Sequence, residues 1–140
     1  MRNRISVITL GVSDLAKAVT FYQEGLGFVT EGIIGTEFDN GAVAFFDMQN
    51  GLKLALWPRT SIAADTGLSI QGNAALEFTL GHNVLSKEEV DAAMLKAKRA
   101  GAKIVKPATD TFYGGYAGYF QDLDEHLWEI VFNPQLLPND

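Results

Sequence analysis

The tripeptide Thr9-Leu10-Gly11 occurs again as Thr79-Leu80-Gly81, 70 residues further along a chain of 140 residues. Each copy lies in an apolar run typical of a strand, and each run leads into a stretch with helical periodicity. Later in each half, segment 46–56 aligns with segment 120–130, since both begin with Phe and end in an alternating apolar strand. A repeat of this size predicts two equivalent modules in a pseudo-twofold arrangement.

In each half, the sequence pattern predicts a strand, then a helix, then three strands. In the first half, Ser13 or Asp14 is expected to cap a helix that ends near Gly25 and Gly27, and residues 58–70 are interpreted as a connection without regular structure. The expected strands of this half are 5–12, 28–34, 42–47 and 52–57. In the second half we expect strands at 73–81 and 102–106, a helix capped by Ser86 and Glu89, a loop at 111–118 and a hairpin of 119–122 with 126–132. Pro107 is expected to end the strand 102–106.

Length and composition indicate one domain, residues 1–140, with module one at about 1–69 and module two at about 70–140. The chain is 47% hydrophobic and 20% charged, and has no cysteine, which predicts a soluble cytoplasmic protein without disulfides or thiolate chemistry. We find no signal peptide and no apolar run long enough to span a membrane. The net charge of −6 argues against a nucleic-acid partner and mildly favours a neutral or cationic ligand.

The order of short motifs resembles that of the vicinal oxygen chelate superfamily, which includes glyoxalase I, bleomycin-resistance proteins and extradiol dioxygenases. The matching residues are Thr9 to Leu15, Phe21-Tyr22, Leu26-Gly27-Phe28, Ala100-Gly101-Ala102, Gly114-Gly115-Tyr116, Gly118-Tyr119-Phe120 and Leu127 to Ile130. The resemblance implies an α+β fold with two βαβββ modules, whose curled mixed sheets surround a ligand cleft. It also implies a homodimer.

The resemblance further implies four metal-ligand positions, which come from the first and last strand of each half. On this sequence they fall on Val7, Ala55, Glu129 and either Glu77 or, in a register shifted by four residues, Asn73. Val7 and Ala55 have no metal-binding atom, and two carboxylates without imidazole make a poor zinc, nickel or iron site. We therefore expect no metal cofactor. A hard divalent cation held by Glu77, Glu129 and water is the alternative.

Glu129 is the leading candidate for a catalytic residue, with Glu77 as a second. Alternation along the last strand puts Glu129 on a face with Leu127 and Val131, opposite Trp128 and Ile130. A carboxylate among apolar groups resists ionisation and suits general acid–base transfer of a proton next to a carbonyl. In the alternative interpretation Glu129 is structural, and accepts a hydrogen bond or pairs with Lys53.

Aromatic residues are the candidates for ligand binding. Trp57, Phe112, Tyr113 and Tyr116 form a possible wall for a flat or cationic ligand, beside Thr9 and Lys53 on the strands. Gly114 and Gly115 would let their loop move over the cleft. The alternative is an ordinary hairpin whose aromatic side chains cap the core.

The sequence thus supports three hypotheses for a cleft protein of the glyoxalase/bleomycin-resistance type. The first is a metal-independent lyase or isomerase that uses Glu129. The second is a protein that only binds and sequesters a drug or metabolite. The third is a metal-dependent lyase similar to glyoxalase I, which the residues at positions 7 and 55 oppose.

Overall fold

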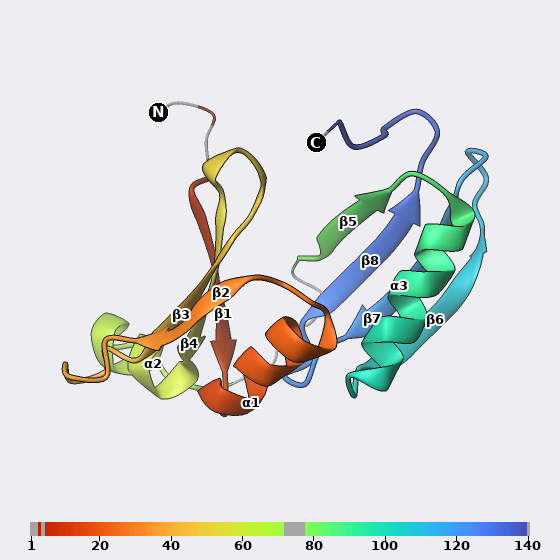
Figure 1. Ribbon diagram of the computed structural model, residues 1–140. Coiled ribbons are helices and arrows are strands. Elements are labelled where there is room, and N and C mark those ends of the chain that lie inside the picture. The colour runs from red at the N-terminus through yellow and green to blue at the C-terminus, as the bar shows by residue number, and fades with distance from the viewer. Residues whose placement is uncertain (1–2, 4, 72–77, 140) are drawn as a thin grey trace. The chain divides into compact units, whose positions relative to one another are not determined.

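The computed structural model describes residue 3, residues 5–71 and residues 78–139. The chain divides into two compact units, Met1–Gly72 and Asn73–Asp140 (Figure 1). Each unit holds a four-stranded mixed sheet with helices, so the protein is α+β. The strand orders are β1-β4-β3-β2 and β5-β8-β7-β6, and in each the first and last strand of the unit pair in parallel.

The first unit begins with strand β1, Val7–Val12, which leads into helix α1, Leu15–Thr20, as expected. Asp14 caps α1, because its carboxylate accepts a hydrogen bond from the Lys17 N–H at 3.0 Å. The remaining elements are a π-helical turn at Phe21–Gly25, β2 at Thr30–Ile34, β3 at Val43–Asp47, a 3₁₀ turn at Gln49–Gly51, β4 at Lys53–Pro58 and helix α2 at Arg59–Thr66.

The core of the first unit lies on one face of its sheet, under α1 and the π-helical turn. Leu10 and Leu56 lie side by side on this face and are buried. The ring of Tyr22 packs on that of Phe46, with centroids 5.9 Å apart. Alternation along β1 and β4 thus directs these two leucines to the core.

Helix α2 corrects the expectation of an irregular connection at 58–70. Pro58 precedes the helix with an extended ψ, and Gly67 ends it in the left-handed conformation, with its N–H bonded to the Ala63 carbonyl at 2.9 Å. A Cβ at Gly11 would lie 3.0 Å from the Arg59 side chain. The helix therefore packs over the end of β1, where the sequence offers a glycine, and this tertiary contact was not predicted.

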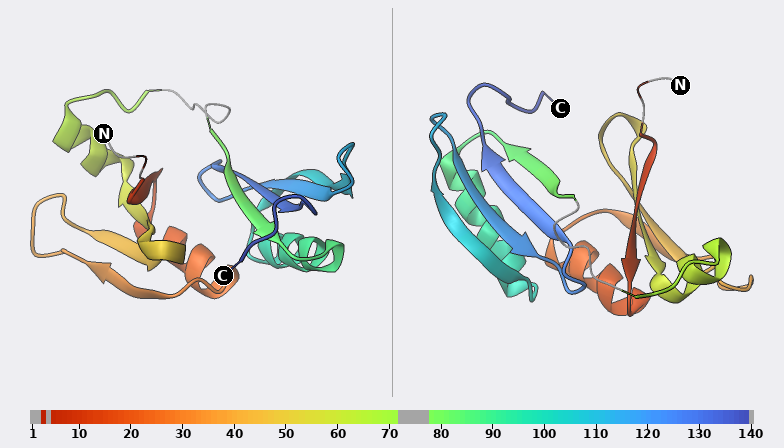
Figure 2. Two further views of the ribbon diagram at one scale, coloured as in Figure 1. Left: turned by 90° about the horizontal axis from the view of Figure 1, so that it is seen from above. Right: turned by 180° about the vertical axis from the view of Figure 1, so that it is seen from behind.

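The second unit contains β5, Leu80–Val84; α3, Lys87–Arg99; β6, Lys103–Asp110; β7, Tyr116–Gln121; and β8, Leu127–Phe132. Helix α3 covers one face of the sheet (Figure 2). The predicted capping box is confirmed: the Ser86 hydroxyl accepts from the Glu89 N–H at 3.2 Å, and the Glu89 carboxylate accepts from the Leu85 N–H at 2.8 Å. No helix in the described ranges is long and apolar enough to cross a membrane.

Pro107 does not end a strand, contrary to the prediction, because β6 continues through it to Asp110. Strand β6 lies at the edge of its sheet, and its pairing with β7 shifts register between Lys106 and Thr109. An edge strand with a bulge tolerates the missing N–H of proline.

The repeated tripeptides do not occupy equivalent places in the two sheets. Thr9 lies beside Ala55, and Gly81 lies beside Glu129. Since segment 46–56 aligns with 120–130, Glu129 is the counterpart of Ala55, and Gly81 that of Thr9, not of Gly11. The offset between the first strands is therefore 72 residues and not 70. A shift of two residues keeps every side chain on its predicted face. Of the expected strand 73–81, residues 73–77 lie outside the described residues.

The core of the second unit lies between α3 and its sheet, and two phenylalanines that differ in burial test this placement. Phe120 is 1% exposed and stacks on Trp128, with ring planes 4° apart, whereas Phe112 is fully exposed. We expect Phe120→Ala to lower the free energy of unfolding in urea by about 3–5 kcal/mol. The matched variant Phe112→Ala should change it by less than about 0.5 kcal/mol. Equal effects of the two variants would contradict the assignment.

Candidate functional site

The candidate site residues of the first unit lie on the sheet face opposite α1, which we call the first open face. Here Val7 lies beside Lys53, and Lys53 beside Asp47. One step along the strands, Thr9 lies beside Ala55, which is beside Phe45. This register directs the side chains of Lys53 and Ala55 to the face opposite α1.

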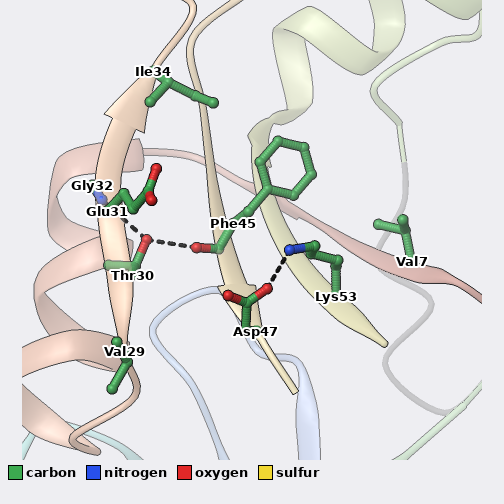
Figure 3. Close-up of a pocket in the computed structure, with 9 residues that line it drawn as sticks. All are labelled: Val7, Val29, Thr30, Glu31, Gly32, Ile34, Phe45, Asp47 and Lys53. Atoms are coloured by element: carbon green, nitrogen blue, oxygen red, sulfur yellow. Dashed lines mark hydrogen bonds and ion pairs between the residues drawn. The ribbon is translucent and has the colours of Figure 1, made fainter. Parts of the chain in front are cut away.

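A pocket of about 510 Å³ lies on the first open face (Figure 3). Lys53 and Asp47 form an ion pair in it. Lys53 therefore has a carboxylate partner on the neighbouring strand of its own sheet. The lining residues are Val7, Val29, Thr30, Glu31, Gly32, Ile34, Phe45, Asp47 and Lys53.

A β-bulge in β2 shapes one wall of this pocket. Thr30 pairs with Phe46 and Ile33 with Ala44, so that the two residues Glu31 and Gly32 lie opposite Phe45 alone. The Thr30 hydroxyl donates to the Phe45 carbonyl at 2.6 Å and accepts from the Gly32 N–H at 3.1 Å. Gly32 has a φ of +94°, a value that glycine adopts at little cost.

Two other ligand-binding candidates of this unit lie outside the pocket lining. Thr9 is exposed on the open face, and Trp57 is half-buried. The Trp57 indole N–H donates to the Asn40 carbonyl at 2.9 Å. Trp57 is thereby held to the loop between β2 and β3.

In the second unit, Glu129 and Tyr119 form a hydrogen-bonded pair on the face opposite α3, the second open face. They lie directly across from each other on β8 and β7. The Tyr119 hydroxyl donates to Glu129 Oε2 at 2.7 Å. Their neighbours on this face, Ala117 and Val131, are buried. Glu129 thus accepts a hydrogen bond, as the alternative interpretation expects. Its other carboxylate oxygen, Oε1, has no partner among the described residues.

The pair changes the acidity of Tyr119. Its hydrogen bond to Glu129, then burial, and then the charges of Glu129 and Tyr113 raise the pKa of Tyr119 to about 12. Tyr119 therefore stays protonated, as a donor to the carboxylate, over the whole neutral range.

The loop predicted at 111–118 is shorter in the structure, because β7 begins at Tyr116, and the aromatic residues of this segment have different surroundings. The Tyr116 hydroxyl donates to Asp91 of α3 at 2.8 Å, and the Lys87 ammonium lies 5.7 Å from its ring centroid. Tyr116 is thus bound to the helix-covered side and not beside Glu129. Phe112 is fully exposed and packs edge-on against Tyr113, whose charge contributes to the Tyr119 pKa.

The donor set does not fit the metal centre implied by the superfamily. Val7 and Ala55 lie on one face of adjacent parallel strands, yet both side chains are alkyl. Among residues 3, 5–71 and 78–139, no group of three or more His, Cys, Asp or Glu could hold a metal ion. Glu77 and Asn73 lie outside the described residues.

Comparison with known proteins agrees with this fold. The family model for the Glyoxalase/Bleomycin resistance protein/Dioxygenase superfamily matches residues 4–130, and the chain belongs to this superfamily. A glyoxalase-related enzyme from Fulvimarina pelagi is 35% identical, with a TM-score of 0.80 over 95% of this chain and 90% of that chain. The protein YwbC of Bacillus subtilis is 27% identical over 94% of this chain and 98% of its own length.

The fosfomycin resistance protein FosX from Listeria monocytogenes is a further structural relative. It is 25% identical, with a TM-score of 0.67 over 95% of both chains. A mutant of FosX, in complex with Mn(II) and 1S,2S-dihydroxypropylphosphonic acid, is 27% identical, with a TM-score of 0.62 over 93% of this chain and 90% of that chain.

Sequence reasoning missed Tyr119 and the bulge at Gly32. The strands 119–122 and 126–132 were predicted as a hairpin, and counting back from its acidic turn puts Tyr119 opposite Glu129. Gly32 in the middle of a predicted strand was a signal for a bulge. Either signal can be used only when the pairing of residues between neighbouring strands is known. Alternation along a single strand does not give this pairing.

The Tyr119–Glu129 pair makes a prediction about alkaline pH. A raised pKa means that the folded state holds its proton after the unfolded state has released it. The free energy of unfolding should therefore fall, relative to Tyr119→Phe, as the pH rises from about 10 to about 12. In ultraviolet absorbance titrations of tyrosine, the wild-type minus Tyr119→Phe difference should show one transition near 12, which Glu129→Gln moves toward about 10. A wild-type transition already near 10 would contradict the pair.

Proposed function

We propose that the protein binds a small organic molecule on the second open face and that Glu129 transfers a proton to or from a carbon next to a carbonyl group. The observation that carries this proposal is the Glu129 carboxylate, held by Tyr119 among apolar neighbours. The proposal is supported by the superfamily to which the chain belongs. Similar structures include those of a resistance protein and a glyoxalase-related enzyme.

The geometry suits a general base. Tyr119 occupies Oε2 and fixes the orientation of the carboxylate, and Oε1 remains for a ligand. In the proposed step, Oε1 takes a proton from the carbon and the C–H electron pair moves into the enolate. Either the proton then returns to a different atom of the enolate, or the enolate electron pair expels a leaving group from the next carbon and protonated Glu129 gives that group the proton. The first outcome is isomerisation and the second is elimination, and neither requires a metal. Tyr119 is a positioning residue in this scheme.

Solvent exchange tests the proposed proton transfer without knowledge of the final product. Purified protein in D₂O is incubated with hydroxyacetone, pyruvate or the hemithioacetal of methylglyoxal and glutathione, and deuterium at carbon is followed by NMR. We expect wild-type protein to accelerate exchange for at least one of them, and Glu129→Gln to reduce the rate by about 10²-fold or more.

The matched control is Glu88→Gln, which removes the same charge from an exposed position in the first turn of α3. This variant should exchange at the wild-type rate. If Glu129→Gln exchanges as fast as Glu88→Gln, or if wild-type protein accelerates none of the probes, the catalytic assignment fails.

A second candidate function is sequestration of a drug or metabolite without turnover. The pocket of about 510 Å³ on the first open face favours it, because pockets of this size bind small ligands. This function predicts that ligands raise the melting temperature equally in wild-type protein and Glu129→Gln. Phe45→Ala, which removes a partly exposed aromatic ring from the pocket lining, should weaken retention. Loss of binding in Glu129→Gln alone would contradict it.

Metal-dependent lyase activity has no support from the donor set, and no step is assigned to a metal. A homodimer in the cytoplasm is the assembly and location that we infer from the superfamily resemblance and the composition. Light scattering after size exclusion measures the first of these, and a mass of one chain would contradict it.

A further inference from the structure

We infer that the pocket on the first open face binds a small organic cation with an apolar body, and not an anion. This inference rests on the second candidate function, ligand binding by the first unit, and gives it a ligand class. It does not depend on the chemistry of Glu129.

The walls of the pocket include apolar side chains that are only partly covered. Val7 is 45% exposed, Ile34 is 47% exposed and the Phe45 ring is 37% exposed, and all three line the pocket. Exposed apolar groups that line one concavity indicate a binding site. An aromatic or aliphatic ligand body would remove them from water.

The charged groups of the pocket leave one negative charge unbalanced. Asp47 and Lys53 neutralise each other as an ion pair. The Glu31 carboxylate has no hydrogen bond or ion pair with any other described residue, and Glu31 lines the same pocket. A ligand ammonium would meet the Glu31 carboxylate and lie near the Phe45 ring, whose face attracts cations. A ligand carboxylate would meet Glu31 and Asp47 and would have to compete with Asp47 for Lys53.

The bulge in β2 brings the apolar and the acidic part of the pocket together. In a regular strand, residues 31 and 34 would point to opposite faces of the sheet. The extra residue at the bulge turns both Glu31 and Ile34 to the pocket. Figure 3 shows the Thr30 hydroxyl that holds the bulge, between the Phe45 carbonyl and the Gly32 N–H. The strand thus has a local irregularity, fixed by two hydrogen bonds, where the unbalanced carboxylate lies.

The test uses three probes of the same size and different charge: tryptamine, tryptophol and indole-3-acetate. Each is titrated into ¹⁵N-labelled full-length protein, and the amide shifts of residues 30–34 and 45 report on the pocket. We expect tryptamine to bind about three-fold more tightly than tryptophol, as for a partly exposed charge pair. Indole-3-acetate should bind most weakly.

Glu31→Gln should remove the advantage of tryptamine over tryptophol while the apolar contribution to binding remains. The matched control is Glu24→Gln, which removes the same charge from the π-helical turn, outside the pocket lining. This variant should keep the advantage. The same spectra show whether each variant is folded.

Two outcomes would overturn the inference, and they are distinguishable. Tighter binding of indole-3-acetate, with shifts at the same amides, would show a pocket selective for anions and would leave ligand binding by the first unit standing. No shifts with any probe would remove both the cation assignment and the sequestration function. Neither result bears on deuterium exchange by Glu129.

Discussion

The parallel pairing of the first and last strand in each unit decides which side chains meet on the open faces. In the first unit this pairing sets Thr9 beside Ala55, and in the second it sets Gly81 beside Glu129. The adjacent antiparallel strand then adds one more neighbour to each row, Phe45 in the first and Tyr119 in the second. Because side chains alternate along strands, this register decides which side chains lie beside Ala55 and Glu129 on the open faces.

The two halves have diverged at these equivalent positions. The first unit carries the apolar pair Ala55 and Phe45, and its charged groups lie one step further along the strands, at Lys53 and Asp47. The second carries the polar pair Glu129 and Tyr119, held at 2.7 Å. Equivalent strands thus carry an apolar pair beside the Lys53–Asp47 ion pair in the first unit, and the oriented Glu129 carboxylate in the second. This difference is the reason that we assign the sequestration function to the first unit and proton transfer to the second.

Much of the fold could be predicted from local patterns. Leu10 and Leu56 on the core side, the Ser86–Glu89 capping box and the position of Glu129 all follow from periodicity or capping chemistry. Helix α2 and the strand through Pro107 could not be predicted, because the first depends on packing over Gly11 and the second on an edge position in the sheet. Tyr116 was grouped with the ligand-binding residues, yet its hydroxyl is bonded to Asp91 on α3. That contact joins residues 25 positions apart, and no pattern within a single strand contains it.

We propose that the protein acts without the metal that the superfamily resemblance implies, because Val7 and Ala55 occupy two of the four implied ligand positions. Elemental analysis tests it most directly, on untagged protein before and after loading with nickel, zinc, manganese and iron, followed by dialysis. We expect no stoichiometric metal after any loading. One tightly bound ion per chain, lost in Glu129→Gln, would contradict it and would make Glu129 a metal ligand.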